Sequence, residues 1–165
     1  MNFSSIKEYF YKLYNVCYLI TLFPLGIFIY LYLQMQVGKL NSLVQELDKI
    51  LMFQIGLVVI ALVALTTVHL VISRKIKKIR TVPSLGDRLE YYYYFSIQRM
   101  MGIAVASSFM ALGLWLTNSD LFSILYLVIL IWLSLQWPSP KMACKDLALR
   151  GDEREMVLYK RDTLG

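Results

Sequence analysis

The chain has 165 residues, of which 58% are hydrophobic and only 17% are charged. Soluble domains carry about 25% charged residues, so this composition leaves little material for a separate soluble domain. The net charge of +6 does not indicate nucleic-acid binding, because six of the 17 basic residues fall in one segment between apolar runs. We expect a membrane domain over residues 1–138 and a short cytosolic tail over residues 139–165.

Four apolar runs occupy residues 13–35, 50–73, 95–116 and 121–137. A helix needs roughly 20 mostly apolar residues to cross the hydrocarbon core of a bilayer. We therefore predict an all-α membrane protein with four transmembrane helices, near residues 13–37, 41–80, 92–117 and 120–137.

An amphipathic segment precedes the first run. Ser5 and Glu8 have the spacing of a capping box, which satisfies exposed backbone amides at a helix start. Ile6 and Leu13 share a helical face, which predicts a lead-in lying at the membrane interface. Pro24 removes one backbone donor and should kink the first helix near its middle.

The second predicted helix carries a stripe with the three-four spacing of a coiled coil. The stripe contains the polar residue Gln54 among these apolar residues: Leu43, Leu47, Ile50, Leu57, Ala61 and Ala64. We predict one long helix from Asn41 to Arg80, roughly 60 Å in length, which would project beyond the bilayer on both sides. The stripe packs either on helices of the same chain or on a second copy.

The third predicted helix follows a loop around Pro83 and Gly86 and begins among four tyrosines, residues 91–94, at the membrane boundary. Farther along this helix, small residues fall near one face and would let another backbone approach closely: Gly102, Ala106 and Gly113. Such a face predicts an interface within the chain or between subunits.

Asp120 should cap the fourth helix. The tail fits two alternatives. Asp152 could cap a short helix, or the segments on either side of Gly151 could pair as a β-hairpin. We predict the helix.

Basic residues in short loops stay on the cytosolic side and set the orientation of a membrane protein. They gather before the first helix, between the second and third, and in the tail. We therefore expect both termini in the cytosol and the protein to be integral to a cell or inner membrane. The densest cluster either anchors this topology alone or also binds anionic lipid headgroups; it comprises Arg74, Lys75, Lys77, Lys78 and Arg80.

Polar side chains inside a bilayer are candidates for function; the candidates here are Gln54, His69, Gln98 and Arg99. Arg99 could extend to the cytosol or to a lipid phosphate; the alternatives are a gating role and pairing with another chain. His69 most simply bonds a neighbouring threonine or serine hydroxyl; the alternative is a proton-linked or metal-binding role.

No carboxylate lies inside the four apolar runs. Proton-coupled transporters usually carry intramembrane acids, and hydrolases need metal ligands or a nucleophile beside a base. We therefore expect no enzymatic activity, no metal site and no cofactor.

These observations favour a non-enzymatic, polytopic membrane protein that acts through protein contacts. It would be a self-associating scaffold, a sensor or an accessory subunit of a membrane complex, with lipids and protein subunits as its partners. The alternative is a homo-oligomeric ion channel or pore lined by Gln54, Thr66, Thr67 and His69. A small transporter or a lipid-handling enzyme is a third possibility.

Overall fold

The computed structural model describes residues 5–40 and 46–161. All secondary structure in these residues is helical: α1 (Ile6–Gln36), α2 (Leu47–Ile79), α3 (Leu85–Thr117), α4 (Asp120–Leu135), α5 (Pro140–Asp146) and α6 (Gly151–Tyr159). The first three helices are long and apolar enough to cross a membrane, and α4 with α5, bent by 75°, gives a fourth candidate if that pair is one span. The prediction of an all-helical, membrane-embedded protein is confirmed at this level.

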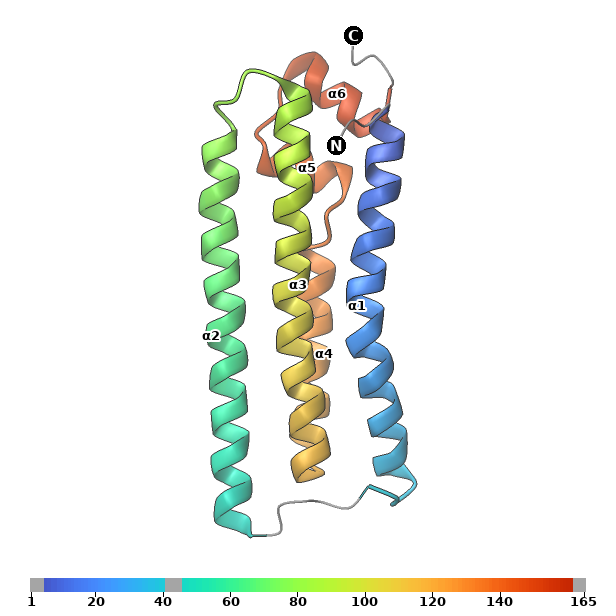
Figure 1. Ribbon diagram of the computed structural model, residues 1–165, viewed down its shortest axis with the longest axis vertical. Helices are drawn as coiled ribbons and strands as arrows, with labels where there is room; N and C mark the ends of the chain where they lie inside the picture. Colours follow the sequence, from blue (N-terminus) through green and yellow to red (C-terminus); the bar gives the residue numbers. More distant parts are fainter. Residues whose placement is uncertain (1–4, 41–45, 162–165) are drawn as a thin grey trace.

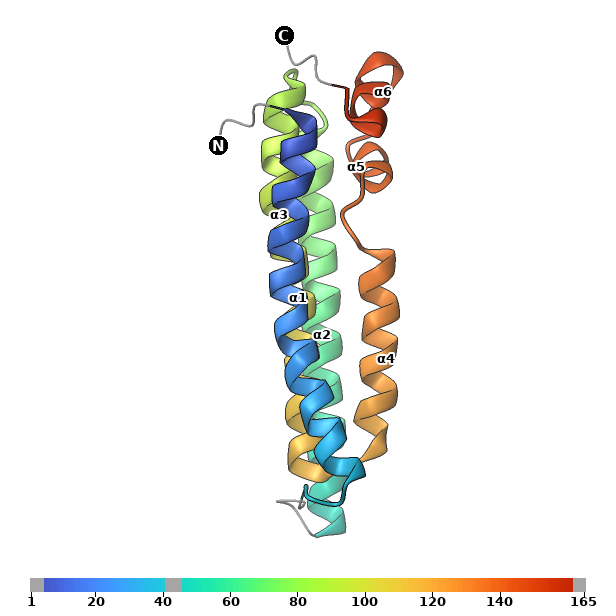
Figure 2. The same ribbon diagram turned by 90° about the vertical axis from the view of Figure 1, so that its right-hand side faces the viewer.

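Helix α3 lies at the centre of the bundle. It packs against α1, α2 and α4; α1 and α2 flank it in one layer, and α4 lies behind that layer (Figure 1, Figure 2). Buried residues run along α3 from Arg88 to Thr117, whereas α1 and α2 expose most of their apolar side chains. The other three long helices are therefore positioned by their contacts with α3.

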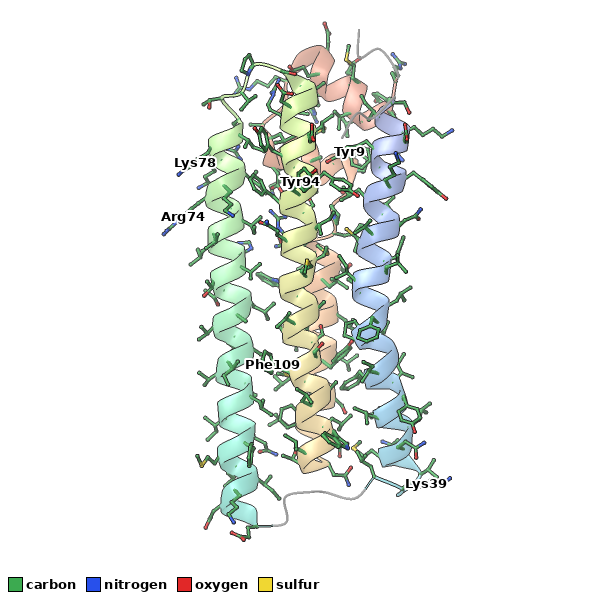
Figure 3. The ribbon with its side chains drawn as sticks, in the orientation of Figure 1. Tyr9, Lys39, Arg74, Lys78, Tyr94 and Phe109 are labelled. Atoms are coloured by element: carbon green, nitrogen blue, oxygen red, sulfur yellow. The ribbon has the colours of Figure 1, made fainter. Side chains whose placement is uncertain are left out.

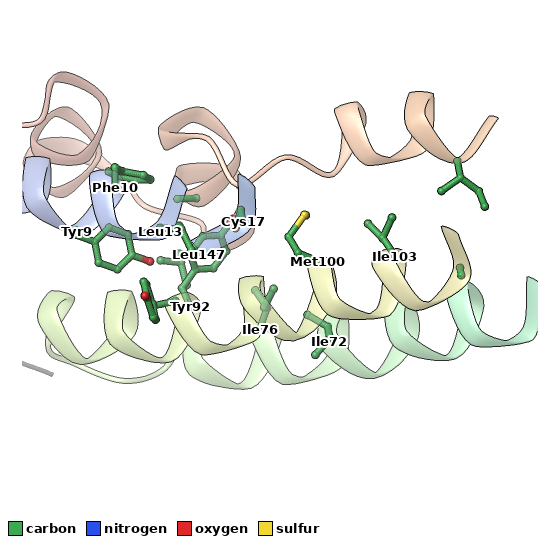
Figure 4. Close-up of a cluster of buried hydrophobic side chains, with 14 of the residues drawn as sticks. Tyr9, Phe10, Leu13, Cys17, Ile72, Ile76, Tyr92, Met100, Ile103 and Leu147 are labelled. Atoms are coloured by element: carbon green, nitrogen blue, oxygen red, sulfur yellow. The ribbon is translucent and has the colours of Figure 1, made fainter. Parts of the chain in front are cut away.

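The stripe on α2 lies on the side of the helix that is buried within the chain. Ala61 of the stripe is buried, as are Ile72 and Ile76, which continue its helical spacing toward the end of α2. Figure 4 shows Ile72 and Ile76 directed toward α3. Between Ala61 and Ile72, Val68 lies against Gly102 of α3. The remaining predicted positions with described side chains are half-buried: Ile50, Gln54, Leu57 and Ala64. The stripe thus covers a helix of the same chain.

Helix α2 begins at Leu47, after extended backbone at Glu46. Its 33 residues make a helix about 50 Å long, which is shorter than predicted. The predicted start at Asn41 and the stripe residue Leu43 lie outside the described residues, as does the side chain of Leu47.

Two helices begin about seven residues earlier than predicted. The Ser5 hydroxyl accepts a hydrogen bond from the Glu8 amide at 3.1 Å, as the capping pattern predicted, but the lead-in continues directly into α1 and its apolar face is buried in protein. Helix α3 begins at Leu85, and the Ser84 hydroxyl accepts from the Asp87 amide at 3.4 Å. The predicted loop therefore shrinks to residues 80–84, because the tyrosine segment continues the buried face of α3.

The tail forms two short helices. The predicted helix near Asp152 is present as α6, and the hairpin alternative is wrong for the described residues. Helix α5 was not predicted; Pro140 starts it, and the Ser139 hydroxyl accepts from the Met142 amide at 3.2 Å. The predicted caps are wrong: α4 and α6 begin after Ser119 and Arg150, and neither side chain caps its helix.

Two glycines of α3 allow close packing, and this predicts a mutational result. A Cβ atom at Gly102 would lie 2.6 Å from the Val68 Cγ1 atom of α2, and a Cβ atom at Gly113 would overlap the Phe122 ring of α4. We expect Gly102→Ala and Gly113→Ala to lower stability by about 1–3 kcal/mol each, because a packed interface must shift. Thermal unfolding in detergent measures the effect.

Gly56→Ala on α2 is the matched control, because no atom lies within 4 Å of its added Cβ. Its stability should stay equal or rise. Equal destabilisation by all three variants would contradict the close-packing explanation.

Candidate functional site

A half-buried carboxylate at the end of α5 ties the tail to the bundle. Both terminal nitrogens of Arg99 on α3 lie 3.3 Å from the Oδ2 atom of Asp146. The Tyr92 hydroxyl donates to the same oxygen at 3.4 Å. The Arg80 Nε atom, just after α2, donates to the Asp146 backbone carbonyl at 2.8 Å. We call these four residues the Asp146 network.

Arg99 is only 4% exposed, so the prediction that it extends to the cytosol or to a lipid phosphate is wrong. A guanidinium removed from water needs a counter-charge close by. Asp146 supplies that charge from the same chain, because α5 folds back beside α3. The Nε atom of Arg99 has no partner among the described residues.

A second ion pair attaches the last helix, α6, to α3. Arg88 on α3 is buried and pairs through its Nη2 atom with Glu153 of α6. Arg88, Tyr92 and Arg99 are separated by four and seven residues, so they share one face of α3. Each tail helix is therefore fixed to that face by one carboxylate.

Aromatic and apolar contacts complete the attachment of the tail. The Trp137 ring lies 4.9 Å from the Tyr18 ring and 6.4 Å from the Tyr14 ring of α1, measured between centroids. The Lys160 Nζ atom lies 5.8 Å from the Phe10 and Tyr14 ring centroids. Leu147 is buried beside Tyr92 and the first turns of α1 (Figure 4). The tail is therefore part of the folded core.

The other predicted polar candidates lie apart from this network. The Gln54 Nε2 atom donates to the Ser119 hydroxyl at 3.0 Å and so ties α2 to the turn between α3 and α4. His69 is half-buried and its ring makes an edge contact with Trp132 of α4 at 5.7 Å. Its Nδ1 atom has no hydrogen-bond partner among the described residues. Gln98 is exposed.

The predicted lipid-binding cluster divides in two. Arg80 belongs to the Asp146 network, whereas Arg74 and Lys78 point away from the bundle (Figure 3). Lys77 is also exposed, and the Lys75 Nζ atom lies 5.6 Å from the Phe95 ring centroid.

The small-residue face of α3 lies at helix contacts within the chain, and Ala106 between its two glycines is fully buried.

An apolar hollow of about 300 Å³ separates α2 from α4. Its walls include Ala61, Leu62 and His69 from α2 and Val128 and Trp132 from α4.

The described residues contain no group of three or more His, Cys, Asp or Glu side chains placed to hold a metal ion. No family model, curated protein or solved structure matches this chain.

Sequence reasoning missed Asp146, Tyr92 and Glu153. The sequence does place two acids in the tail, Asp146 and Glu153, seven residues apart. It also places their respective partners, Arg99 and Arg88, on one face of α3 eleven residues apart. Neither spacing identifies the pairs, because it does not show that the tail folds back.

The ion pair predicts a strong and non-additive stability effect. We expect Asp146→Leu to lower stability by about 3–5 kcal/mol, because it leaves the buried Arg99 charge uncompensated. Arg99→Met combined with Asp146→Leu should recover most of that loss, because apolar replacement of both charges is often neutral. Thermal unfolding and the rate of tryptic cleavage in the tail measure the effect. A double variant as unstable as Asp146→Leu would contradict this explanation.

The Gln54 contact gives an independent prediction at the opposite end of the bundle. Gln54→Leu and Ser119→Ala should each lower stability by about 0.6–2 kcal/mol, the range for hydrogen bonds between membrane helices. Combining them should cost no more than the larger single effect, because both remove the same bond. Fully additive losses would show that the two side chains act separately.

Proposed function

We propose that this protein is a non-enzymatic membrane scaffold or accessory subunit that associates with a second copy of itself. In this proposal four segments cross the bilayer, with both termini in the cytosol. Support for that orientation comes from the fold: α1 begins and α6 lies at the same end of the bundle (Figure 1), which is also where the basic cluster of α2 lies (Figure 3). At about 50 Å, α2 exceeds the roughly 30 Å hydrocarbon core and extends beyond it.

The observation that carries the proposal is the hollow between α2 and α4. Membrane helices associate by close packing and interhelical hydrogen bonds, because lipid tails are as apolar as the helices. A concave apolar wall lacks contact atoms on one side and loses their dispersion energy. A helix from a second copy can fill the hollow and supply those contacts.

The surroundings of the hollow support a protein occupant. On α2, Leu62 is 57% exposed although it lines the hollow. His69 contributes an imidazole to the same wall, and such a group favours a partner that brings a hydrogen-bonding side chain. At the end of the bundle where α5 and α6 lie, the Asp146 network fixes the tail, so each copy would present a rigid cytosolic surface to other subunits.

Filling the hollow should prevent self-association. We expect Leu62→Trp to shift the protein toward the monomer in lipid nanodiscs, measured by subunit-counting fluorescence or by mass. Val63→Trp is the matched control, because Val63 is 59% exposed but does not line the hollow; it should leave the assembly unchanged. A wild-type protein that is monomeric at all concentrations would overturn the proposal, as would an assembly that both variants leave intact.

A further inference from the structure

Lys141 and Lys145 of α5 form the common wall of two hollows. One hollow, of about 490 Å³, lies toward the end of α4, where Leu135 and Trp137 also line it. The other, of about 400 Å³, lies toward α6, where Leu149 and Arg154 complete the wall. A molecule lying across the two lysines could therefore reach the end of a membrane helix on one side and a third cation on the other.

The bend between α4 and α5 favours a membrane boundary at these lysines. Helices α4 and α5 form a candidate span only as a pair, and α5 turns by 75° from α4 after a short connection that contains Trp137. Tryptophan is enriched where hydrocarbon meets headgroups. A helix turned this far from the direction of the preceding span runs closer to the plane of the membrane than to its normal, so its exposed face meets headgroups.

The charges around the two hollows are unbalanced. Lys141 and Lys145 are four residues apart and so lie on one side of α5, and both are exposed. The structure shows no ion pair of Lys141, Lys145 or Arg154 with any other described residue. The neighbouring acids Asp146 and Glu153 pair with Arg99 and Arg88 instead. Three cations therefore line the hollows while those two carboxylates are engaged with α3.

The site is held rigidly. The Asp146 network fixes one end of α5, and the Ser139 hydroxyl caps the other. The Cys144 thiol lies 3.8 Å from the Arg154 carbonyl, which joins α5 to α6. The three cations are therefore presented in a fixed arrangement that does not depend on self-association.

We propose that Lys141, Lys145 and Arg154 bind the headgroup of an anionic phospholipid. The phosphate lies between the two lysines, and the glycerol end and acyl chains lie against Leu135 and Trp137. Arg154 on the far wall selects against choline and ethanolamine headgroups, because it repels their positive charge. The exposed cluster on α2 differs, since Arg74 and Lys78 point outward from a single helix (Figure 3).

The test measures phosphatidylglycerol binding to the full-length protein in phosphatidylcholine nanodiscs, by native mass spectrometry and thermal stability. Lys141→Gln with Lys145→Gln should reduce phosphatidylglycerol affinity about 30-fold, since each lysine near a charged surface contributes a factor of about five. Stability in pure phosphatidylcholine should not change, which shows that the double variant is folded. Arg154→Gln should narrow the preference for phosphatidylglycerol over phosphatidylcholine while retaining binding.

Lys77→Gln with Lys78→Gln is the matched control, because it removes the same charge from exposed lysines of α2 and should leave affinity unchanged. An equal loss in this control would overturn the proposal in favour of general surface attraction.

Soluble glycerol 3-phosphate supplies the same phosphate without acyl chains. If it stabilises the protein as strongly as phosphatidylglycerol, the site takes a soluble phosphate ester and the lipid assignment is wrong. Unchanged lipid affinity in the α5 double variant would also overturn the proposal.

Discussion

The ion pair between the buried Arg99 and the half-buried Asp146 is the constraint on which the arrangement of this protein depends. Removing a guanidinium from water is unfavourable by several kcal/mol unless an opposite charge and hydrogen bonds compensate it. Arg99 lies well inside α3, among packed helices, so the compensating carboxylate must come to it. That requirement brings α5 back along α3 and makes the tail part of the core. Arg88 and Glu153 then fix α6 in the same way.

The central position of α3 explains both the packing of the bundle and its exposed surfaces. Small residues at Gly102 and Gly113 let α2 and α4 approach α3 closely. Because α2 and α4 both pack on α3, they leave a hollow between them that the chain does not fill. In lipid, such a surface gains packing energy when another helix covers it. The proposed assembly with a second copy would use this hollow.

The tail divides its charges between two faces. Asp146 and Glu153 face inward and neutralise arginines of α3, while Lys141, Lys145 and Arg154 line the outer hollows of α5 and α6. The inward pairs hold the two helices in place, and the outward cations are then available to an anionic ligand. Folding of the tail and the proposed recognition of a headgroup thus depend on one arrangement of charges.

The sequence alone determined the membrane-embedded helical class, the cap at Ser5 and the stripe on α2, because these follow from local composition and periodicity. It did not determine the starts of α1 and α3, since Tyr9 and Tyr92 suit either a membrane boundary or a protein core, and only their neighbours decide between the two. The roles of Arg99 and Gln54 depended on Asp146 and Ser119, which are 47 and 65 residues away. No local sequence pattern identifies partners that are this far apart in the chain, because only tertiary packing brings them together.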